Sequence, residues 1–332
     1  MLRIALPGLA DSARRCLRDG DSVRLPAAEW LLARGRRQRL PVPDWRSWLL
    51  ADAGLEGDVL QRFAAGPCAR FADAAVEGAP GLTWARAEPV HLLAAIDHLQ
   101  LAAPVPQPLE PAESAELIGA LNRHLAGSGF RLHARPRSGW LCECPPGLEF
   151  TGTEPVAAVG RNLRDLLPAG RDAARVRSLV NELQMLLHEH PVNGRRAAAG
   201  RATVNSVWLW GAGVAGSPQG TTADLLLTDD DWLAGLWRLH GGRVGPPGEL
   251  ARAVGDETSS LRVAIAPPAS GRTAVEDLRE FEMTVLARAR VALAAGGIRH
   301  ISLHTGREVL EIGAGARWAI WRRGRPILEV FA

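Results

Sequence analysis

The chain has 332 residues, of which 47% are apolar and 23% charged, values close to the averages of globular proteins, so disordered and fibrous classes are excluded. No apolar run approaches the length of about 18 residues that is needed to cross a membrane, and we expect no membrane association. The net charge of +3 is small and the arginines are spread along the chain, so nucleic acid is an unfavoured partner. The two densest basic runs, 34–39 and 322–325, have the pattern of a solvated helix end or hairpin tip, and the alternative is that they contact a nucleic-acid phosphate backbone.

A single hydrophobic core seldom organises this many residues, so we expect one large domain that carries a second, smaller one. The first apolar run, residues 2–10, is too short for a secretory segment, which predicts a cytoplasmic protein. The cysteines, Cys16, Cys68, Cys142 and Cys144, have neither the spacing of a zinc site nor that of a CxxC pair. We therefore expect reduced thiols and no metal.

The first elements along the chain are typical of an α/β fold. Residues 2–6 form a short apolar run that ends at Pro7-Gly8, which predicts a buried strand followed by a turn. A helix is expected over 26–35, with proline at its start and glycine at its end. Four prolines within 103–111 break any regular element and mark a connection.

The middle of the chain has the pattern of a smaller α+β region. An amphipathic helix is expected over 113–127, and two short strands at 130–133 and 140–144 suggest an antiparallel hairpin. The strongest helical periodicity covers 172–188, and Pro191 is expected to stop this helix.

A strand is expected over 204–210, and beyond it strands and helices alternate, which predicts a parallel sheet covered by helices. The strands are expected at 225–228, 261–266 and 299–304, and the helices at 231–240 and 274–295. The last three short runs predict an antiparallel meander with a turn at Arg323-Gly324; they are 308–312, 317–321 and 327–331.

Polar side chains gather at the end of the 172–188 helix. His188, His190, Asn193, Arg195 and Arg196 could together hold a phosphate or a carboxylate, because arginine offers a planar pair of donors and asparagine a neutral donor. Histidines two residues apart on a helix face away from each other, and no third ligand is evident, which argues against zinc. The alternative left open is that both histidines cap the helix C-terminus.

Two other groups of polar residues have structural interpretations that compete with chemical ones. The run Asp229-Asp230-Asp231 precedes a helix and is better suited to capping it than to binding a hard cation. Ser12, Ser47 and Ser270 are candidate nucleophiles by residue type alone, because none lies in a G-x-S-x-G turn.

Two motifs carry a resemblance to a known family. They are HPVN-x-x-R at 190–196 and VNSVWLWG-x-G at 204–213. They resemble a segment of the archaeal-type cofactor-independent phosphoglycerate mutases of the alkaline phosphatase superfamily. Over its whole length the chain is similar to the bacterial RpfE-type regulatory proteins, which are phosphoglycerate-mutase-like.

The resemblance implies an alkaline-phosphatase-like α/β core with a mostly parallel sheet, interrupted by an inserted α+β cap. The core would comprise 1–85 and 214–332, and the cap 86–213, with Asn193, Arg196 and Asn205 at matching positions of the cap. The residues at the positions of the family's metal ligands and nucleophile differ in this chain. Pro7-Gly8 replaces an Asp-Gly, only Ser47 lies near the expected nucleophile at 44–46, and the expected metal ligands are replaced by Pro-Pro-Ala-Ser at 267–270 and by His304-Thr305-Gly306.

The resulting hypothesis is a non-catalytic regulatory protein that binds an anionic, phosphorylated small molecule or a protein partner, with no cofactor and no catalytic residue. The candidate ligand-binding residues are His188, His190, Asn193, Arg195, Arg196, Asn205, Trp208 and Trp210. The alternative is an active metal-dependent mutase or phosphatase with an atypical site. That alternative predicts that His188, His190, His304 and Asp229 converge.

Overall fold

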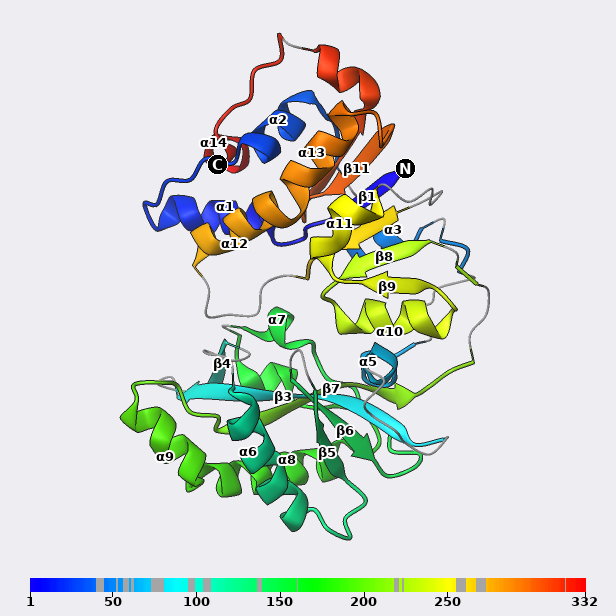
Figure 1. The fold of residues 1–332 in the computed structure, drawn as a ribbon. Helices are drawn as coiled ribbons and strands as arrows, with labels where there is room; N and C mark the ends of the chain where they lie inside the picture. Colours follow the sequence, from blue (N-terminus) through cyan, green and yellow to red (C-terminus); the bar gives the residue numbers. More distant parts are fainter. Residues whose placement is uncertain are drawn as a thin grey trace. The chain divides into compact units, whose positions relative to one another are not determined.

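The computed structural model describes residues 1–39, 45–51, 53–55, 60, 63–72, 81–94, 99–103, 109–135, 139–159, 161–217, 221–222, 224–254, 261–266, 273–319 and 321–332. The chain forms two compact units (Figure 1). The first comprises Met1–Gly57, Pro218–Pro268 and Arg272–Ala332, and the second, among the described residues, lies within Asp58–Ser217. The domain boundaries expected at 85/86 and 213/214 differ from these, and the first of them would cut through a single long strand.

The first unit is built on a mostly parallel sheet, as the alternation of strands and helices predicts. The seven described strands follow the order β2-β12-β11-β1-β10-β8-β9. β1, β8, β9, β10 and β11 run parallel, whereas β12 is antiparallel to β11 and β2 is antiparallel to β12. The strands are β1 (Leu2–Ala5), β2 (Arg36–Arg39), β8 (Leu225–Thr228), β9 (Arg243–Gly245), β10 (Leu261–Ala264), β11 (His300–His304) and β12 (Glu308–Gly313).

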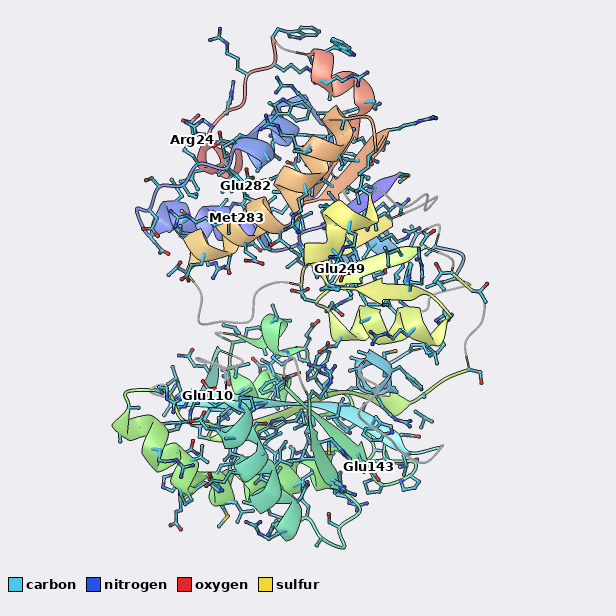
Figure 2. The ribbon with its side chains drawn as sticks, viewed as in Figure 1. Arg24, Glu110, Glu143, Glu249, Glu282 and Met283 are labelled. Carbon is cyan, nitrogen blue, oxygen red and sulfur yellow. The ribbon has the colours of Figure 1, made fainter. Side chains whose placement is uncertain are left out.

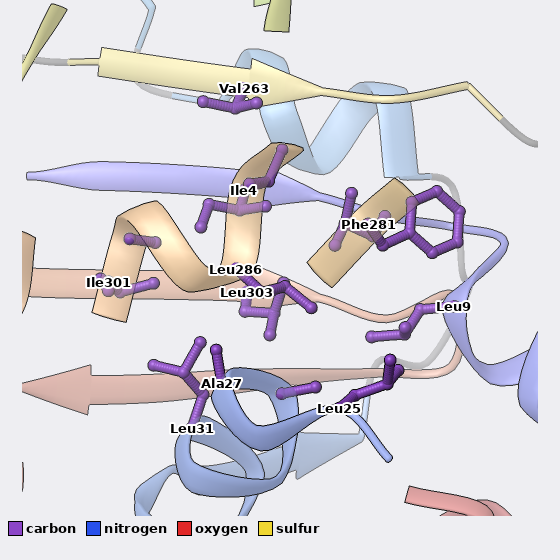
Figure 3. Packing of buried hydrophobic residues seen from close by; sticks show 14 of the residues in the cluster. Ile4, Leu9, Leu25, Ala27, Leu31, Val263, Phe281, Leu286, Ile301 and Leu303 are labelled. Atoms are coloured by element: carbon purple, nitrogen blue, oxygen red, sulfur yellow. The ribbon is translucent and has the colours of Figure 1, made fainter. Parts of the chain in front are cut away.

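Helices cover both faces of this sheet. The helical elements of the first unit are α1 (Leu9–Arg18), α2 (Pro26–Arg34), α3 (Trp45–Leu50), α10 (Asp231–Leu239), η2 (Pro247–Glu249), α11 (Leu250–Ala253), α12 (Ala274–Phe281), the π-helical turn η3 (Glu282–Leu286), α13 (Ala287–Ala294), η4 (Ala314–Trp318) and α14 (Ile327–Phe331). Ile4, Val263 and Leu303 lie side by side on three strands, and their face packs on α2 and α12–α13 (Figure 3). On the opposite face, Arg3 and Arg262 donate to backbone carbonyls of α3 and of the residues just after it.

One carboxylate links α2 to the α12–α13 helix of the first unit. Glu282, labelled in Figure 2, accepts hydrogen bonds from the backbone N–H groups of Ala27 at 2.6 Å and Ala28 at 3.0 Å. These N–H groups belong to the first turn of α2 and have no partner within the helix. A negative charge is also favoured at that end of a helix dipole, so Glu282 fixes α2 against the α12–α13 helix.

The second unit is an antiparallel sheet with helices. Its path is β4-β3-β6-β5, and β7 pairs with β3 off that path. The strands are β3 (Thr83–Ala94), β4 (Leu99–Ala103), β5 (Arg131–Ala134), β6 (Trp140–Cys144) and β7 (Ser206–Val214). The helical elements are α5 (Ala65–Ala72), α6 (Pro111–His124), α7 (Pro155–Ala158), η1 (Leu163–Leu166), α8 (Ala173–His188) and α9 (Pro191–Ala198). α6 begins with a reciprocal cap between Glu110, labelled in Figure 2, and Glu113.

The α/β fold class is confirmed, with a mostly parallel sheet in one unit and an α+β arrangement in the other. The 130–144 hairpin is also confirmed, because β5 and β6 pair antiparallel. The predicted C-terminal meander is wrong after its first strand: 314–318 is a 3-10 helix and 327–331 an α-helix. Among the described helices, none is long and apolar enough to cross a membrane.

Candidate functional site

The carboxyl ends of the parallel strands in the first unit are where open α/β sheets usually bind ligands. Thr228, Ala264, Ala5 and His304 form one row across β8, β10, β1 and β11. The residues that follow this row form the edge of the sheet. Of the positions singled out from the sequence, 44 and 267–270 lie outside the described residues.

Two aspartates follow β8 at this edge. Asp229 accepts a hydrogen bond from the Ala266 backbone N–H at 2.8 Å. Desolvation by the surrounding protein, and then the charges of Asp230 and Asp231, raise the pKa of Asp229 to about 7. The residue as a whole is exposed, whereas its carboxyl group is surrounded by protein atoms that disfavour the charged form. A carboxylate with this pKa can exchange a proton near neutral pH.

Asp230 is occupied by structural contacts. It caps α10 by accepting from the Leu233 backbone N–H at 2.9 Å, which confirms the predicted capping role of this acidic run. The Arg46 guanidinium donates to the same carboxylate at 2.8 and 3.1 Å and stacks on the rings of Trp45 and Trp232. The segment where the resemblance places a serine nucleophile therefore supplies a half-buried arginine that ties α3 to α10.

The described residues at this edge do not fit the two-metal set that the resemblance implies. His304 is buried, and its Nδ1 accepts from the Gly306 backbone N–H at 3.0 Å. β11, which His304 ends, is three strand spacings from β8, which Asp229 follows, a separation of roughly 14 Å. His188 and His190 belong to the second unit. Among the described residues, no three His, Cys, Asp or Glu side chains are grouped as metal ligands would be.

Asn193, predicted as a ligand-binding residue, lies in the interior of the second unit. Its amide nitrogen donates to the carbonyls of Leu187 and Val204, both at 2.7 Å, and its amide oxygen accepts from the Val204 N–H at 2.8 Å. The side chain thereby joins the end of α8, the start of α9 and the segment that leads into β7. These three bonds occupy both amide hydrogens and the amide oxygen.

Arg196 is also internal, with a side chain that is 0% exposed. It donates to the carbonyl of Ala202 at 2.8 Å and to Glu113 at 2.7 Å, and Glu113 pairs at the same time with Arg201 at 2.6 Å. Despite its burial, the hydrogen bonds and charges around Glu113 hold its pKa below the usual value. Arg196 therefore anchors α9 to the start of α6.

The remaining polar candidates, at the junction of α8 and α9, are spread over the surface of the second unit. His190 caps the N-terminus of α9, where its Nδ1 accepts from the Val192 N–H at 3.3 Å, so the predicted capping of the preceding helix C-terminus is wrong for this residue. His188 is exposed at the end of α8, and Arg195 is an exposed partner of Glu116 at 2.6 Å. The predicted residues therefore do not form one open anion site.

The other predicted ligand-binding residues, which lie on or next to β7, are close to a cavity. Asn205 pairs with the backbone of Leu92 on β3, through its oxygen at 2.7 Å and its nitrogen at 2.9 Å. Trp208 donates from Nε1 to the carbonyl of Thr153 at 2.8 Å, and Trp210 lies beside the Arg86 guanidinium at 6.0 Å. These contacts fix β7, whose residues 206–209 form one wall of the cavity.

The cavity has a volume of about 550 Å³ and lies wholly within the second unit, between β7, α8, η1 and the ends of β3 and β4. Its apolar lining includes Leu99, Leu163, Leu167, Val180 and Trp208. Leu99 and Leu167 are exposed, so part of this apolar lining is open to solvent. Its size and lining are those of a small-molecule site.

Polar groups are few, and apart from Ser206 on β7 they lie on the helical side. Arg177 donates to the carbonyl of Pro168 at 2.9 Å and retains further donors, while Arg164 and Asn181 line the cavity from exposed positions. Sequence reasoning missed all three residues. A signal existed on α8, because Arg177, Val180, Asn181 and Gln184 recur at the spacing of one helix face.

Comparison with known proteins gives partial matches. No family model matches the chain. The 2,3-bisphosphoglycerate-independent phosphoglycerate mutase of Methanothrix thermoacetophila is 42% identical over 65 residues, which are 20% of this chain and 17% of that protein. A second such mutase, from Methanothermobacter thermautotrophicus, is 32% identical over 111 residues, 32% of this chain and 27% of that protein. The chain therefore has homologues among these mutases, and its matches span about a quarter or less of their length.

Two solved structures are similar over nearly the whole chain. The PH0037 protein from Pyrococcus horikoshii has a TM-score of 0.52 at 15% identity, covering 99% of this chain and 91% of that one. A cofactor-independent phosphoglycerate mutase from Thermoplasma acidophilum has a TM-score of 0.44 at 17% identity, covering 98% and 93%. At such identities, the first likeness shows a shared fold only.

Proposed function

We propose that this chain is a phosphoglycerate-mutase-like regulatory protein of the RpfE type that binds an anionic metabolite without turning it over. The observation that carries the proposal is the cavity beside β7, with an apolar lining and the guanidiniums of Arg164 and Arg177 at its polar side. Arginine is well suited to a carboxylate or phosphate, and the apolar lining favours a ligand that carries a hydrophobic body on its anionic group.

The sheet edge of the first unit supports binding without turnover. There, Pro7-Gly8 stands in place of the expected aspartate, and Asp230 is paired with Arg46. The proposed location is the cytoplasm, where neighbouring thiols such as those of Cys142 and Cys144, whose sulfurs are 3.8 Å apart, stay reduced.

One observation favours an active enzyme as the alternative. Asp229 has a pKa of about 7 and lies at the edge where α/β enzymes place their chemistry. This alternative is tested by assaying the purified chain with 3-phosphoglycerate and manganese or zinc. Turnover well above that of a blank would overturn the non-catalytic proposal, and its loss in Asp229→Asn would support the alternative.

Ligand binding is tested with 8-anilinonaphthalene-1-sulfonate, a fluorescent aromatic anion, and with decanoate and 3-phosphoglycerate as competitors. We expect one saturable site from which decanoate displaces the probe more strongly than 3-phosphoglycerate does. A competing ligand at a hundred times its dissociation constant should also stabilise the chain by about 2.7 kcal/mol.

The variants distinguish the cavity from other surfaces. Arg164→Gln with Arg177→Gln should weaken binding at least tenfold, because charge-assisted hydrogen bonds contribute about 1.5–3 kcal/mol each. Arg161→Gln, an exposed arginine of the same unit that does not line the cavity, is the matched control and should change little. Asn181→Trp fills the cavity from an exposed position and should abolish binding. Equal binding by wild type and Asn181→Trp would refute this site.

A further inference from the structure

The fold brings together the two densest basic runs of the chain, which are about 290 residues apart in sequence. The first run lies at the end of α2 and in the edge strand β2, and the second lies between η4 and α14. Arg322 donates from a terminal guanidinium nitrogen to the carbonyl of Arg34 at 3.4 Å. Arg37, Arg323 and Arg325 line one hollow of about 380 Å³, which also contains Glu329.

A glycine permits this close approach. A Cβ placed on Gly324 would lie 3.2 Å from the carbonyl oxygen of Glu29 on α2, which is tighter than ordinary packing. A side chain at this position would require a shift of a few tenths of an ångström between this segment and α2. The run Arg322-Arg323-Gly324-Arg325 is therefore held against the helix with its arginines exposed.

Positive charge is concentrated on this surface although the whole chain carries only +3. Partial burial, together with the nearby charges of Arg290 and Arg322, holds the pKa of Arg34 below its usual value. Arg37 has an acidic neighbour, Glu308, at 3.5 Å. Within the described part of the chain, no ion pair is formed by Arg36, Arg317, Arg322, Arg323 or Arg325.

Exposed tryptophans lie among these arginines. Trp318 and Trp321 are 69% and 75% exposed, whereas tryptophan normally buries most of its large apolar surface. Arg317 stacks on Trp318 at 5.1 Å from the ring centre, and Arg34 lies over the ring of the half-buried Trp30 at 4.6 Å. We call the surface formed by residues 34–37, 317–319 and 321–325 the Arg–Trp surface.

We propose that the Arg–Trp surface binds single-stranded nucleic acid. Guanidiniums pair with backbone phosphates, and exposed indole rings provide stacking platforms for unpaired bases. An anionic membrane is less well matched, because interfacial anchors present a continuous apolar helix face. Here the described part of the surface after Trp318 is not helical until α14, and arginines flank the two tryptophans on both sides in the sequence.

The test uses the full chain and a fluorescein-labelled 20-nucleotide oligo(U), with anisotropy measured from 50 to 200 mM salt. We expect binding that weakens with salt, and indole fluorescence that is quenched on binding. Arg323→Gln with Arg325→Gln should reduce the slope of log affinity against log salt by about 1.4, at about 0.7 per phosphate contact on a single strand. Trp318→Ala with Trp321→Ala should weaken binding at least tenfold without changing that slope, because stacking is not a charge interaction.

The matched control is Arg243→Gln with Arg252→Gln. It removes the same charge from exposed positions, and β9, which carries Arg243, is at the opposite end of the sheet from β2. Equal weakening by this control would overturn the proposal, since it would show an effect of net charge alone. Absence of oligo(U) binding at 50 mM salt would also overturn it, as would binding to phosphatidylglycerol-containing vesicles in preference to oligo(U).

Discussion

The side-chain amide of Asn193 hydrogen-bonds to three backbone groups, the carbonyl and N–H of Val204 and the carbonyl of Leu187, of which the last also accepts from the His190 N–H. We predict that Asn193→Ala lowers the free energy of unfolding by about 3 kcal/mol, because each lost partner of a buried polar group costs on the order of 1–3 kcal/mol. Urea denaturation of the second unit measures this loss. The neighbouring Gly194→Ala should instead stabilise by about 1 kcal/mol, because the glycine is in α9 and its Cβ position is open. A loss below about 1 kcal/mol for Asn193→Ala would contradict this structural role.

Asn193 also shows what the sequence alone could not predict. Its position at a helix end beside histidines and arginines is the pattern of an anion site. Its actual acceptors belong partly to Val204, and only the fold brings that residue to the amide. The same holds for Arg196, whose partner Glu113 is 83 residues away. Residue types predicted the polar character of this corner, and tertiary contacts decided what it binds.

The pKa of Asp229 gives a prediction of pH dependence. Its value of about 7 in the fold lies above the value of about 3.9 for an unfolded chain, so the folded state holds the extra proton between these values. Its stabilising contribution is full below about pH 4 and is lost as the pH rises through 7. Asp229→Asn keeps an oxygen for the Ala266 N–H and should raise the melting temperature at pH 8, on the order of 1–2 °C for an exposed group. At pH 5 the gain should be smaller; an equal gain at both pH values would contradict the assignment.

At the scale of elements, the α12–α13 helix depends on its first turn. The Thr273 hydroxyl accepts from the Glu276 N–H at 3.2 Å, and Glu276 accepts from the Thr273 N–H at 2.7 Å. We predict that Thr273→Ala costs about 1 kcal/mol, the usual effect of losing such a cap. Thr273→Ser keeps the hydroxyl and should cost much less. Thermal unfolding followed by circular dichroism compares the two, and equal losses would show that the methyl group, not the cap, matters.

Elements with strong periodicity were predicted well, and those whose ends depend on context were not. Pro191 stops α8 as expected, but it also occupies the first turn of α9, a position that proline favours. In α1, which was not predicted, Leu9, Ala13 and Cys16 share a buried face at helical spacing. The short apolar run 327–331 suits a strand or a helix equally, and only the absence of a strand partner for it in the described sheet decides between them.

At the scale of the whole molecule, alternation of strands and helices predicted the parallel sheet, whereas the boundary between the units could not be found in the same way. β3 pairs with β6 and β7 from Thr83 onward, so this strand belongs to the second unit from its first residue. A composition shift is not required at such a boundary, since both sides are ordinary folded sequence. The cavity was missed for a related reason: its walls come from five elements.

The last prediction concerns the independence of the second unit. All five strands of its sheet lie within 58–217, and the buried apolar side chains of its main cluster run from Ala85 to Leu209. A segment of about 160 residues with its own core is of the usual size for a domain. We therefore expect the excised segment to unfold cooperatively in urea and to bind 8-anilinonaphthalene-1-sulfonate as the full chain does, because the cavity is lined by residues 92–209 only. Cooperative unfolding without binding would locate the ligand site elsewhere, whereas failure to unfold cooperatively would mean that the core of this unit is incomplete without the remaining segments.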